Sequence, residues 1–172
     1  MNRIYFPTRR AFLGVTASVL SGCGFALRGA VSLSFHSLYL EAQPTQLVRI
    51  LRRRLENIDD LRIIDDPQKK AQAEVILILQ PEQRESVIVG RNSSGGISEV
   101  QLKLSVRFRV LTGGGAELLP ETLLQRQTDQ SDSESAALSK AAEAETVYQT
   151  MLDDIIEQLL RRLTNVRVPQ SS

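Results

Sequence analysis

The chain has 172 residues, of which 21 are Lys or Arg, 20 are Asp or Glu, one is His and one is Cys. Three basic residues fall within the first 22, so the other 150 residues carry 18 basic and 20 acidic side chains, a formal net charge of −2. This balance excludes nucleic-acid binding through overall positive charge, the lone cysteine excludes an intramolecular disulfide, and the length suits one compact domain.

The first residues have the pattern of an export signal. Arg3, Arg9 and Arg10 precede an apolar run from Ala11 to Leu20, about half the ~20 residues that a membrane-spanning helix needs. We therefore predict that residues 1–22 are a signal peptide. The stretch TRRAFL, Thr8 to Leu13, is compatible both with twin-arginine export and with an ordinary basic region, so the export route stays open.

The residues around Cys23 indicate lipidation. Leu20-Ser21-Gly22-Cys23 resembles a bacterial lipobox, in which a peptidase cuts before the cysteine. The thiol then carries diacylglycerol, and the freed amino group takes a further acyl chain. Two or more chains give stable membrane anchoring. The alternative is a leftover or buried thiol behind an ordinary signal peptide. Gly24, where an aspartate would indicate inner-membrane retention, favours the outer membrane.

Behind the signal we predict a tether over residues 23–35, a single domain over 36–168 and a disordered tail over 169–172. The domain opens with a strand over 36–41 and a helix that begins near Pro44 and Thr45. Apolar residues recur on this helix at three- and four-residue spacing: Leu47, Leu51, Leu55 and Ile58. A short strand over 61–64 and a turn at 65–67 follow.

The next segments are predominantly extended. Residues 73–79 (AEVILIL) predict a strand buried on both faces, which Pro81 bends or breaks before the chain continues to Gly90. After a loop at 92–96, every even position from Val100 to Val110 is apolar and every odd one polar, which is typical of a strand with one wet face.

A turn at 112–115 leads to a strand over 118–130 and then to a long helix capped by Asp132 or Ser133. Its apolar stripe consists of Leu138, Val147, Tyr148, Leu152, Ile155, Ile156, Leu159 and Leu163. The order β-α-β-β-β-β-α predicts an α+β fold, a two-layer sandwich with a mixed four- to five-stranded sheet. Two helices cover one face, and the other face stays polar.

No catalytic set is visible. His36 is the only histidine, and the acidic pairs are adjacent residues whose side chains diverge on a helix or strand. The run at 112–115 (TGGG) lacks the lysine and following helix of a phosphate loop. We therefore expect no enzyme, no metal site and no cofactor other than the acyl groups on Cys23.

Basic residues line the polar face of the alternating strand. Lys103, Arg107 and Arg109 share this face, Arg91 lies just before the strand, and Arg126 is a candidate from the neighbouring strand. Such a stripe can bind phosphate groups through charge-assisted hydrogen bonds. The alternative is a solvated face on which the cations pair with Glu99 and Glu121.

The heptad Cys23 to Gly29 (CGFALRG) resembles the start of the LptE-like lipopolysaccharide-assembly lipoprotein family. The order of elements, the R-N-x-x-G-like turn at Arg91, the alternating strand and the alanine-rich start of the last helix are also similar. The resemblance implies a two-layer α/β sandwich. It further implies an outer-membrane lipoprotein that plugs the β-barrel LptD, assists assembly of that barrel and contacts lipopolysaccharide on its way to the cell surface.

By the same resemblance, Arg91 and Lys140 match the residues that contact lipopolysaccharide. The departures are the twin-arginine signal, the SSGG expansion of the turn at 93–96 and Gly90 before the arginine. The implied location is the outer membrane, on its periplasmic side or within the barrel lumen. Two alternatives stay open: a periplasmic-face lipoprotein that carries lipid or envelope polymer without a barrel partner, and a hydrolase of envelope polymers.

Overall fold

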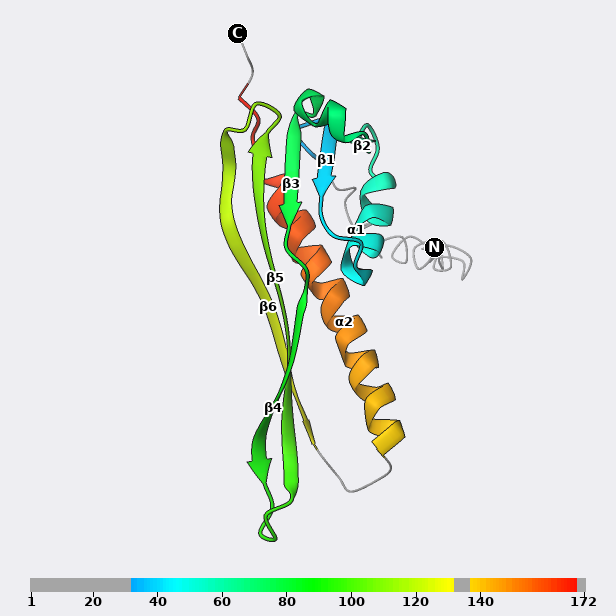
Figure 1. Cartoon of the computed structure of the whole chain (residues 1–172), viewed down its shortest axis with the longest axis vertical. Helices are drawn as coiled ribbons and strands as arrows, with labels where there is room; N and C mark the ends of the chain where they lie inside the picture. The colour runs from blue at the N-terminus through cyan, green and yellow to red at the C-terminus, as the bar shows by residue number, and fades with distance from the viewer. Residues whose placement is uncertain (1–31, 132–136, 170–172) are drawn as a thin grey trace, which may run out of the picture. The chain divides into compact units, whose positions relative to one another are not determined.

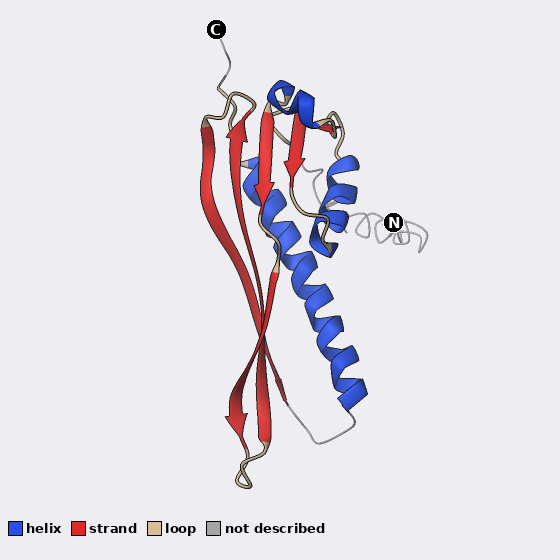
Figure 2. Ribbon diagram, in the orientation of Figure 1, coloured by secondary structure: helices blue, strands red, loops and turns tan. Residues whose placement is uncertain are grey.

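The computed structural model describes residues 32–131 and 137–169. The predicted signal peptide, Cys23 and the predicted helix cap at Asp132 or Ser133 lie outside these residues. Figures 1 and 2 show the described elements. In chain order they are β1 (Ser37–Glu41), α1 (Gln46–Glu56), β2 (Arg62–Ile64), the 3₁₀ helix η2 (Pro67–Gln72), β3 (Val75–Leu79), β4 (Gln83–Arg91), β5 (Ile97–Thr112), β6 (Glu117–Ser131) and α2 (Ala137–Thr164).

One mixed sheet contains all six described strands. The neighbours run β2-β1-β3-β5-β4, and β6 pairs with the other edge of β5. β1 is parallel to β2 and β3, whereas β5 is antiparallel to β3, β4 and β6. β3 and β4 therefore share one edge of β5, because β3 pairs with the part from Phe108 to Thr112 and β4 with the part from Ile97 to Ser105.

The alternation along β5 gives the strand one buried face and one exposed face, as predicted. Leu102, Leu104, Val106, Phe108 and Val110 are all buried, whereas Arg107 and Arg109 are exposed. Directly opposite partners in a sheet share a face, so Leu77 and Leu79 of β3 join this buried set through Val110 and Phe108. The even positions of β5 thus define the core face of the sheet.

The two helices complete the core through their apolar stripes. Leu47, Leu51 and Leu55 of α1 are fully buried, and Thr45 caps the helix by accepting a hydrogen bond from the Val48 amide. Seven of the residues that α2 buries belong to one stripe from Tyr148 to Leu163: Tyr148, Leu152, Ile155, Ile156, Leu159, Leu160 and Leu163. Both helices pack into one hydrophobic cluster with the sheet. The predicted α+β sandwich, with two helices on one face, is confirmed.

The sheet has one strand more than the four or five expected. Pro81 lies between β3 and β4 and breaks the strand, one of the two outcomes predicted for it, the other being a bend. The break is expected because proline has no backbone N–H to donate to a strand ladder. Pairing nevertheless continues at the break, since the Gln80 amide donates to the Arg107 carbonyl over 2.9 Å. β4 then runs in the same direction as β3 along the remaining part of β5.

The second face of the sheet is less polar than predicted. Ile76 pairs with Leu111, an odd position of β5, and so lies on this face, yet it is only 3% exposed. Tyr39 of β1 pairs with Ile76 and shares its face. The Lys70 ammonium of η2 lies 5.8 Å from the centre of the Tyr39 ring and pairs with Glu41. The 3₁₀ helix therefore covers part of the face that we expected to stay polar.

Packing begins before the predicted start of the domain. Phe35 is 1% exposed, and the Ser34 hydroxyl donates to the Val166 carbonyl. At the same end, the β5–β6 turn passes close to the chain that enters β3. A Cβ atom built on Gly113 would lie 2.1 Å from the Ala73 carbonyl oxygen. Only glycine fits at this position, which fixes the turn that the sequence predicts at 112–115.

Candidate functional site

Arg91 is the last residue of β4 and leads into a hydrogen-bonded turn. Its guanidinium donates to the Gly95 carbonyl over 3.0 Å, and the Asn92 side chain accepts hydrogen bonds from the amides of Ser94 and Gly96. Arg91 is exposed, and the described contacts use one of its five N–H donors. The side chain is thus held at the end of the β4–β5 hairpin, where it can bind an anion.

The structure explains why glycine stands before Arg91, which is one of the departures from the family pattern. β4 and β5 shift register on both sides of this residue. A Cβ atom at Gly90 would lie 2.8 Å from the Ser98 hydroxyl oxygen and 2.9 Å from the Glu99 Cβ. The close approach of the two strands requires glycine just before the arginine.

The basic residues of β5 lie on the face opposite α2. Lys103 is 3.5 Å from a carboxylate oxygen of Glu85, and Arg107 is 3.9 Å from one of Glu121. Among the described residues, Arg109 has no ion pair. The face is therefore partly neutralised. Arg107 pairs with Glu121, as the solvated alternative had it, whereas Lys103 pairs with Glu85 and not with Glu99. Ion pairs this exposed contribute little to stability.

Lys140 lies on the other side of the sheet. It belongs to the first turns of α2 and lines an open hollow of about 270 Å³, together with Val100 and Leu102 of β5 and Ala144 of α2. The five predicted phosphate-binding residues therefore do not form one cluster. Arg91 ends the hairpin, Lys140 is on the helical face, and Lys103, Arg107 and Arg109 are on the opposite face.

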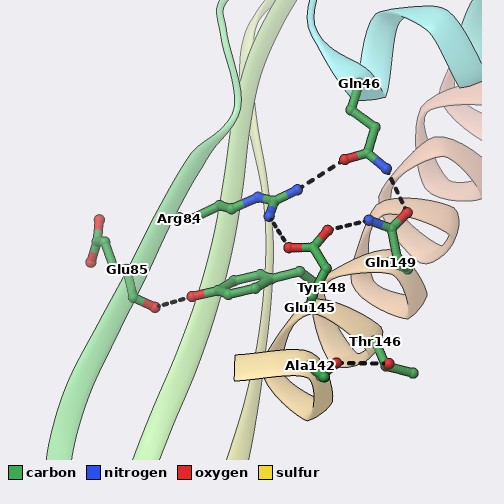
Figure 3. A network of polar contacts seen from close by, with 8 residues as sticks. All are labelled: Gln46, Arg84, Glu85, Ala142, Glu145, Thr146, Tyr148 and Gln149. Carbon is green, nitrogen blue, oxygen red and sulfur yellow. Dashed lines mark hydrogen bonds and ion pairs between the residues drawn. The ribbon is translucent and has the colours of Figure 1, made fainter. Parts of the chain in front are cut away.

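A polar network that sequence reasoning missed fastens α2 to the neighbouring elements (Figure 3). Arg84 of β4 pairs with Glu145 over 2.7 Å and donates to Gln46 of α1 over 3.2 Å. Gln46 in turn donates to Gln149 over 2.7 Å, which closes the link between α1 and α2. The network fixes the position of α2 beside β4 and α1.

Tyr148 joins this network through its ring, which packs against Arg84. Its ring lies beside the Arg84 guanidinium, 4.9 Å from centroid to Cζ, and its hydroxyl donates to the Glu85 carbonyl over 2.8 Å. Burial raises the pKa of the Tyr148 phenol. Hydrogen bonds from Gln149 and then Arg84 lower the pKa of Glu145. From the sequence, Tyr148 was only one member of an apolar stripe, since the partners of its hydroxyl are distant in the chain.

The hairpin also exposes apolar side chains. Val87, Ile88 and Val89 are 45–49% exposed, and Ile97 across the hairpin is 37% exposed. Three consecutive apolar residues in a strand place apolar groups on both faces, so this signal was present in the sequence. The hairpin therefore presents apolar side chains to solvent on both of its faces.

The described residues hold neither a metal cluster nor a membrane-spanning helix. Within residues 32–131 and 137–169, the His, Asp and Glu side chains form no group that could hold a metal ion. None of the described helices is long and apolar enough to cross a membrane.

These features define a two-layer α+β module with a cationic hairpin end and, beside its long helix, an open hollow lined by both apolar and polar side chains. The model of the LptE lipopolysaccharide-assembly family matches residues 35–163. The LPS-assembly lipoprotein LptE of Yersinia enterocolitica is 33% identical over 162 residues, which cover 92% of this chain and 76% of the relative. The corresponding lipoprotein of Yersinia pestis is 34% identical over the same coverage. The chain therefore belongs to the LptE family.

Solved structures agree with this fold. The solution structure of lipoprotein B from Nitrosomonas europaea is 26% identical with a TM-score of 0.69, and covers 82% of this chain and 90% of its own. The rare lipoprotein B from Shewanella oneidensis has a TM-score of 0.64 at 22% identity, over 73% of this chain and 92% of its own, and supports the fold alone.

Proposed function

We propose that the chain is an outer-membrane lipoprotein that plugs an LptD-like β-barrel, assists assembly of the barrel and contacts lipopolysaccharide during its insertion at the cell surface. It acts by binding and not by catalysis. The observation that carries this proposal is the family match across residues 35–163, nearly the whole described domain. The curated relatives with this match are LPS-assembly lipoproteins.

In this proposal Cys23 carries the membrane anchor, a diacylglycerol on the thiol and an acyl chain on the amino group. Labelled palmitate should enter the wild-type protein and not the Cys23→Ala variant. Incorporation into the variant, or a mature protein that begins elsewhere than residue 23, would contradict this part of the proposal. Binding to the barrel should partly survive the substitution, because protein contacts hold the complex.

Lipopolysaccharide contact rests on Arg91 and Lys140. Lipid A combines phosphate groups with acyl chains, and a charge-assisted hydrogen bond to phosphate contributes about 1.5–3 kcal/mol. A few such bonds give binding that is specific but reversible, as a transit site needs. Lys103, Arg107 and Arg109 are secondary candidates, since they occupy the opposite face and two of them have carboxylate partners.

The experiment that tests the partner is purification of the tagged protein from detergent-solubilised outer membranes, followed by mass identification. The proposal predicts recovery of a large β-barrel protein that resists washing. Recovery of the tagged protein only as a free monomer would contradict it and favour the alternative, a lipid or polymer carrier without a barrel partner. The hollow beside Lys140, about 270 Å³ and open, is slightly below the usual range of about 300–1,000 Å³ for enclosing ligand pockets.

A further inference from the structure

The outer edge of β6 is open along most of its length. β6 pairs with β5, and no strand among the described residues pairs with its other side. Edge strands are usually protected against further pairing by short length, proline, lysine or bulges. The register shifts of β6 and Pro120 all come before Thr122, and the register is unbroken from there to Ser131. This part of the edge therefore has none of the usual protection.

The hydrogen bonds of β5 show which backbone groups of β6 face outward. The Gln80 amide donates to the Arg107 carbonyl, so odd positions of β5 turn toward β3 and β4, whereas the Thr112 amide donates to the Ala116 carbonyl on the side of β6. Even positions of β5 therefore bond to β6, because the two orientations alternate along an antiparallel strand. Even residues of β6 lie opposite even residues of β5 in this stretch and turn inward. The N–H and C=O groups of the odd residues face outward: Leu123, Gln125, Gln127 and Asp129.

On the helix face of the sheet, an open hollow of about 270 Å³ lies between β6 and α2. A residue added opposite Thr128 would share its face and project toward this hollow. Val147 and Met151 offer it apolar contact, while the ion pair of Arg126 with Asp154, at 3.4 Å, makes the rest of the lining polar. The hollow therefore suits one apolar side chain of a strand added at this edge.

On the opposite face, two groups of β6 lack a complementary partner. Asp129 accepts a hydrogen bond from Gln101 over 2.8 Å but has no ion pair among the described residues, and Leu123 is 48% exposed. A complementary segment has a cation opposite Asp129 and an apolar residue opposite Leu123. A second copy of β6 does not fit, because its only cation, Arg126, is at an even position. Pairing of the outward odd residues with one another leaves even residues opposite even residues.

We propose that the outer edge of β6, from Thr122 to Ser131, binds an extended segment of another protein, which adds to the sheet as an antiparallel strand. This segment carries a cation opposite Asp129 and apolar residues opposite Thr128 and Leu123. Hydrogen bonds to the outward backbone groups provide affinity, and the three side chains provide specificity. The inference goes beyond the proposed function, since it requires no lipopolysaccharide.

The test uses the ¹⁵N-labelled chain from residue 23 onward with Cys23→Ala, which retains every residue of the described core. The probe is a blocked nine-residue peptide with lysine second, leucine third and eighth, and threonine elsewhere. Antiparallel pairing places these three residues opposite Asp129, Thr128 and Leu123. Peptide should shift the outward amides of β6 and protect them from hydrogen exchange, while the inward amides, already bonded to β5, gain little protection. Equal effects on outward and inward amides, or no protection, would overturn the inference.

Two substitutions at Gln127 separate its backbone from its side chain. Gln127→Pro removes an outward N–H and leaves the bonds to β5, since proline is tolerated at an edge position of this kind. It should weaken peptide binding about tenfold, because a hydrogen bond is lost and the ring blocks the approach of the added strand. Gln127→Ala keeps the N–H and should change binding by less than about twofold. Equal effects of the two substitutions in folded proteins would overturn the inference.

Two threonines one turn apart on α2 test the hollow without changing β6. Thr146 and Thr150 are both exposed, and each hydroxyl donates to the carbonyl four residues earlier, but only Thr150 is among the residues that line the hollow. Thr150→Phe should remove the preference for leucine over alanine at the third peptide position, and Thr146→Phe should not. Equal effects of the two substitutions would overturn the assignment of the hollow.

The charge of the probe and the protein concentration complete the test. A peptide with glutamate in place of lysine should bind at least about fivefold more weakly, since it places two carboxylates opposite each other. Equal affinity of the two peptides would overturn the role of Asp129. Protection of the outward amides that rises with protein concentration, without peptide, would overturn the inference by making a second copy of the chain the occupant.

Discussion

Replacing Tyr148 with phenylalanine tests whether the polar network holds α2 in place. The substitution keeps the buried ring and its contact with Arg84, and removes only the hydroxyl that donates to the Glu85 carbonyl over 2.8 Å. A hydrogen bond of this kind contributes about 1 kcal/mol, and the carbonyl left without its donor adds to the cost. We expect a loss of about 1–2 kcal/mol in unfolding free energy, or about 3–6 °C in Tm.

Urea denaturation followed by circular dichroism measures this loss. Tyr39→Phe is the matched control, because no hydrogen bond of the Tyr39 hydroxyl is present among the described residues, and its ring likewise lies beside a cation, Lys70. The control should change the unfolding free energy by less than about 0.5 kcal/mol. Equal losses in the two variants would refute the role of the Tyr148 hydroxyl.

The pH dependence of the unfolding free energy gives a second test of the Tyr148 hydroxyl. Burial raises the pKa of the Tyr148 phenol in the folded state. The contribution of the neutral phenol to stability is therefore fully present below the unfolded pKa of about 10, and it is lost as pH rises through the folded pKa. The stability difference between wild type and Tyr148→Phe should therefore shrink above pH ~10. A difference that stays constant across this range would contradict the assigned ionisation.

Three further predictions concern other parts of the chain. Gly113→Ala should destabilise the protein by about 1–3 kcal/mol in urea denaturation because the new methyl group meets a backbone carbonyl, whereas Gly114→Ala, whose methyl group would meet only the Thr112 hydroxyl at 3.8 Å, should not. The double variant Arg91→Glu and Lys140→Glu should weaken lipopolysaccharide binding at least tenfold in a direct binding assay, with Tm nearly unchanged. Glu145→Gln should lower stability at neutral pH in urea denaturation, and this difference should vanish as pH falls through the lowered pKa of Glu145.

Each of these predictions has a contradicting result. Equal stability of the two glycine variants would show that the turn adapts to a side chain. Charge reversal at Arg49 and Arg53, both on α1, is the control for lipopolysaccharide binding, and an equal loss there would indicate a nonspecific effect of charge. A Glu145→Gln difference that does not shrink as pH falls below the ordinary glutamate pKa of about 4.3 would contradict the sign of the pKa shift.

Local patterns in the sequence were sufficient to predict much of the fold. The strict alternation from Val100 to Val110 identified both the long strand and its buried face, and the spacing of Leu47, Leu51 and Leu55 identified α1. These signals are local because the periodicity of an element is set by its own backbone geometry. The heptad Cys23 to Gly29 carried the family resemblance, and Lys140 was a candidate through that resemblance alone, whereas Arg91 was also a candidate from its place beside the basic strand.

Features that depend on distant residues could not be predicted in the same way. The placement of β3 and β4 along one edge of β5 depends on pairing between segments up to 37 positions apart, as in Val75 with Thr112. The partners of Tyr148 come from β4, and the sequence gives no sign of them. Lys140 and Lys103 could be named as cations, but their separation onto opposite faces follows only from the packing of α2.

Depletion of the protein in its native host tests the central claim most directly. We predict that the amount of correctly assembled LptD-like barrel in the outer membrane falls, that lipopolysaccharide at the cell surface falls with it, and that the wild-type chain restores both. Unchanged barrel assembly and unchanged surface lipopolysaccharide after complete depletion would contradict the claim.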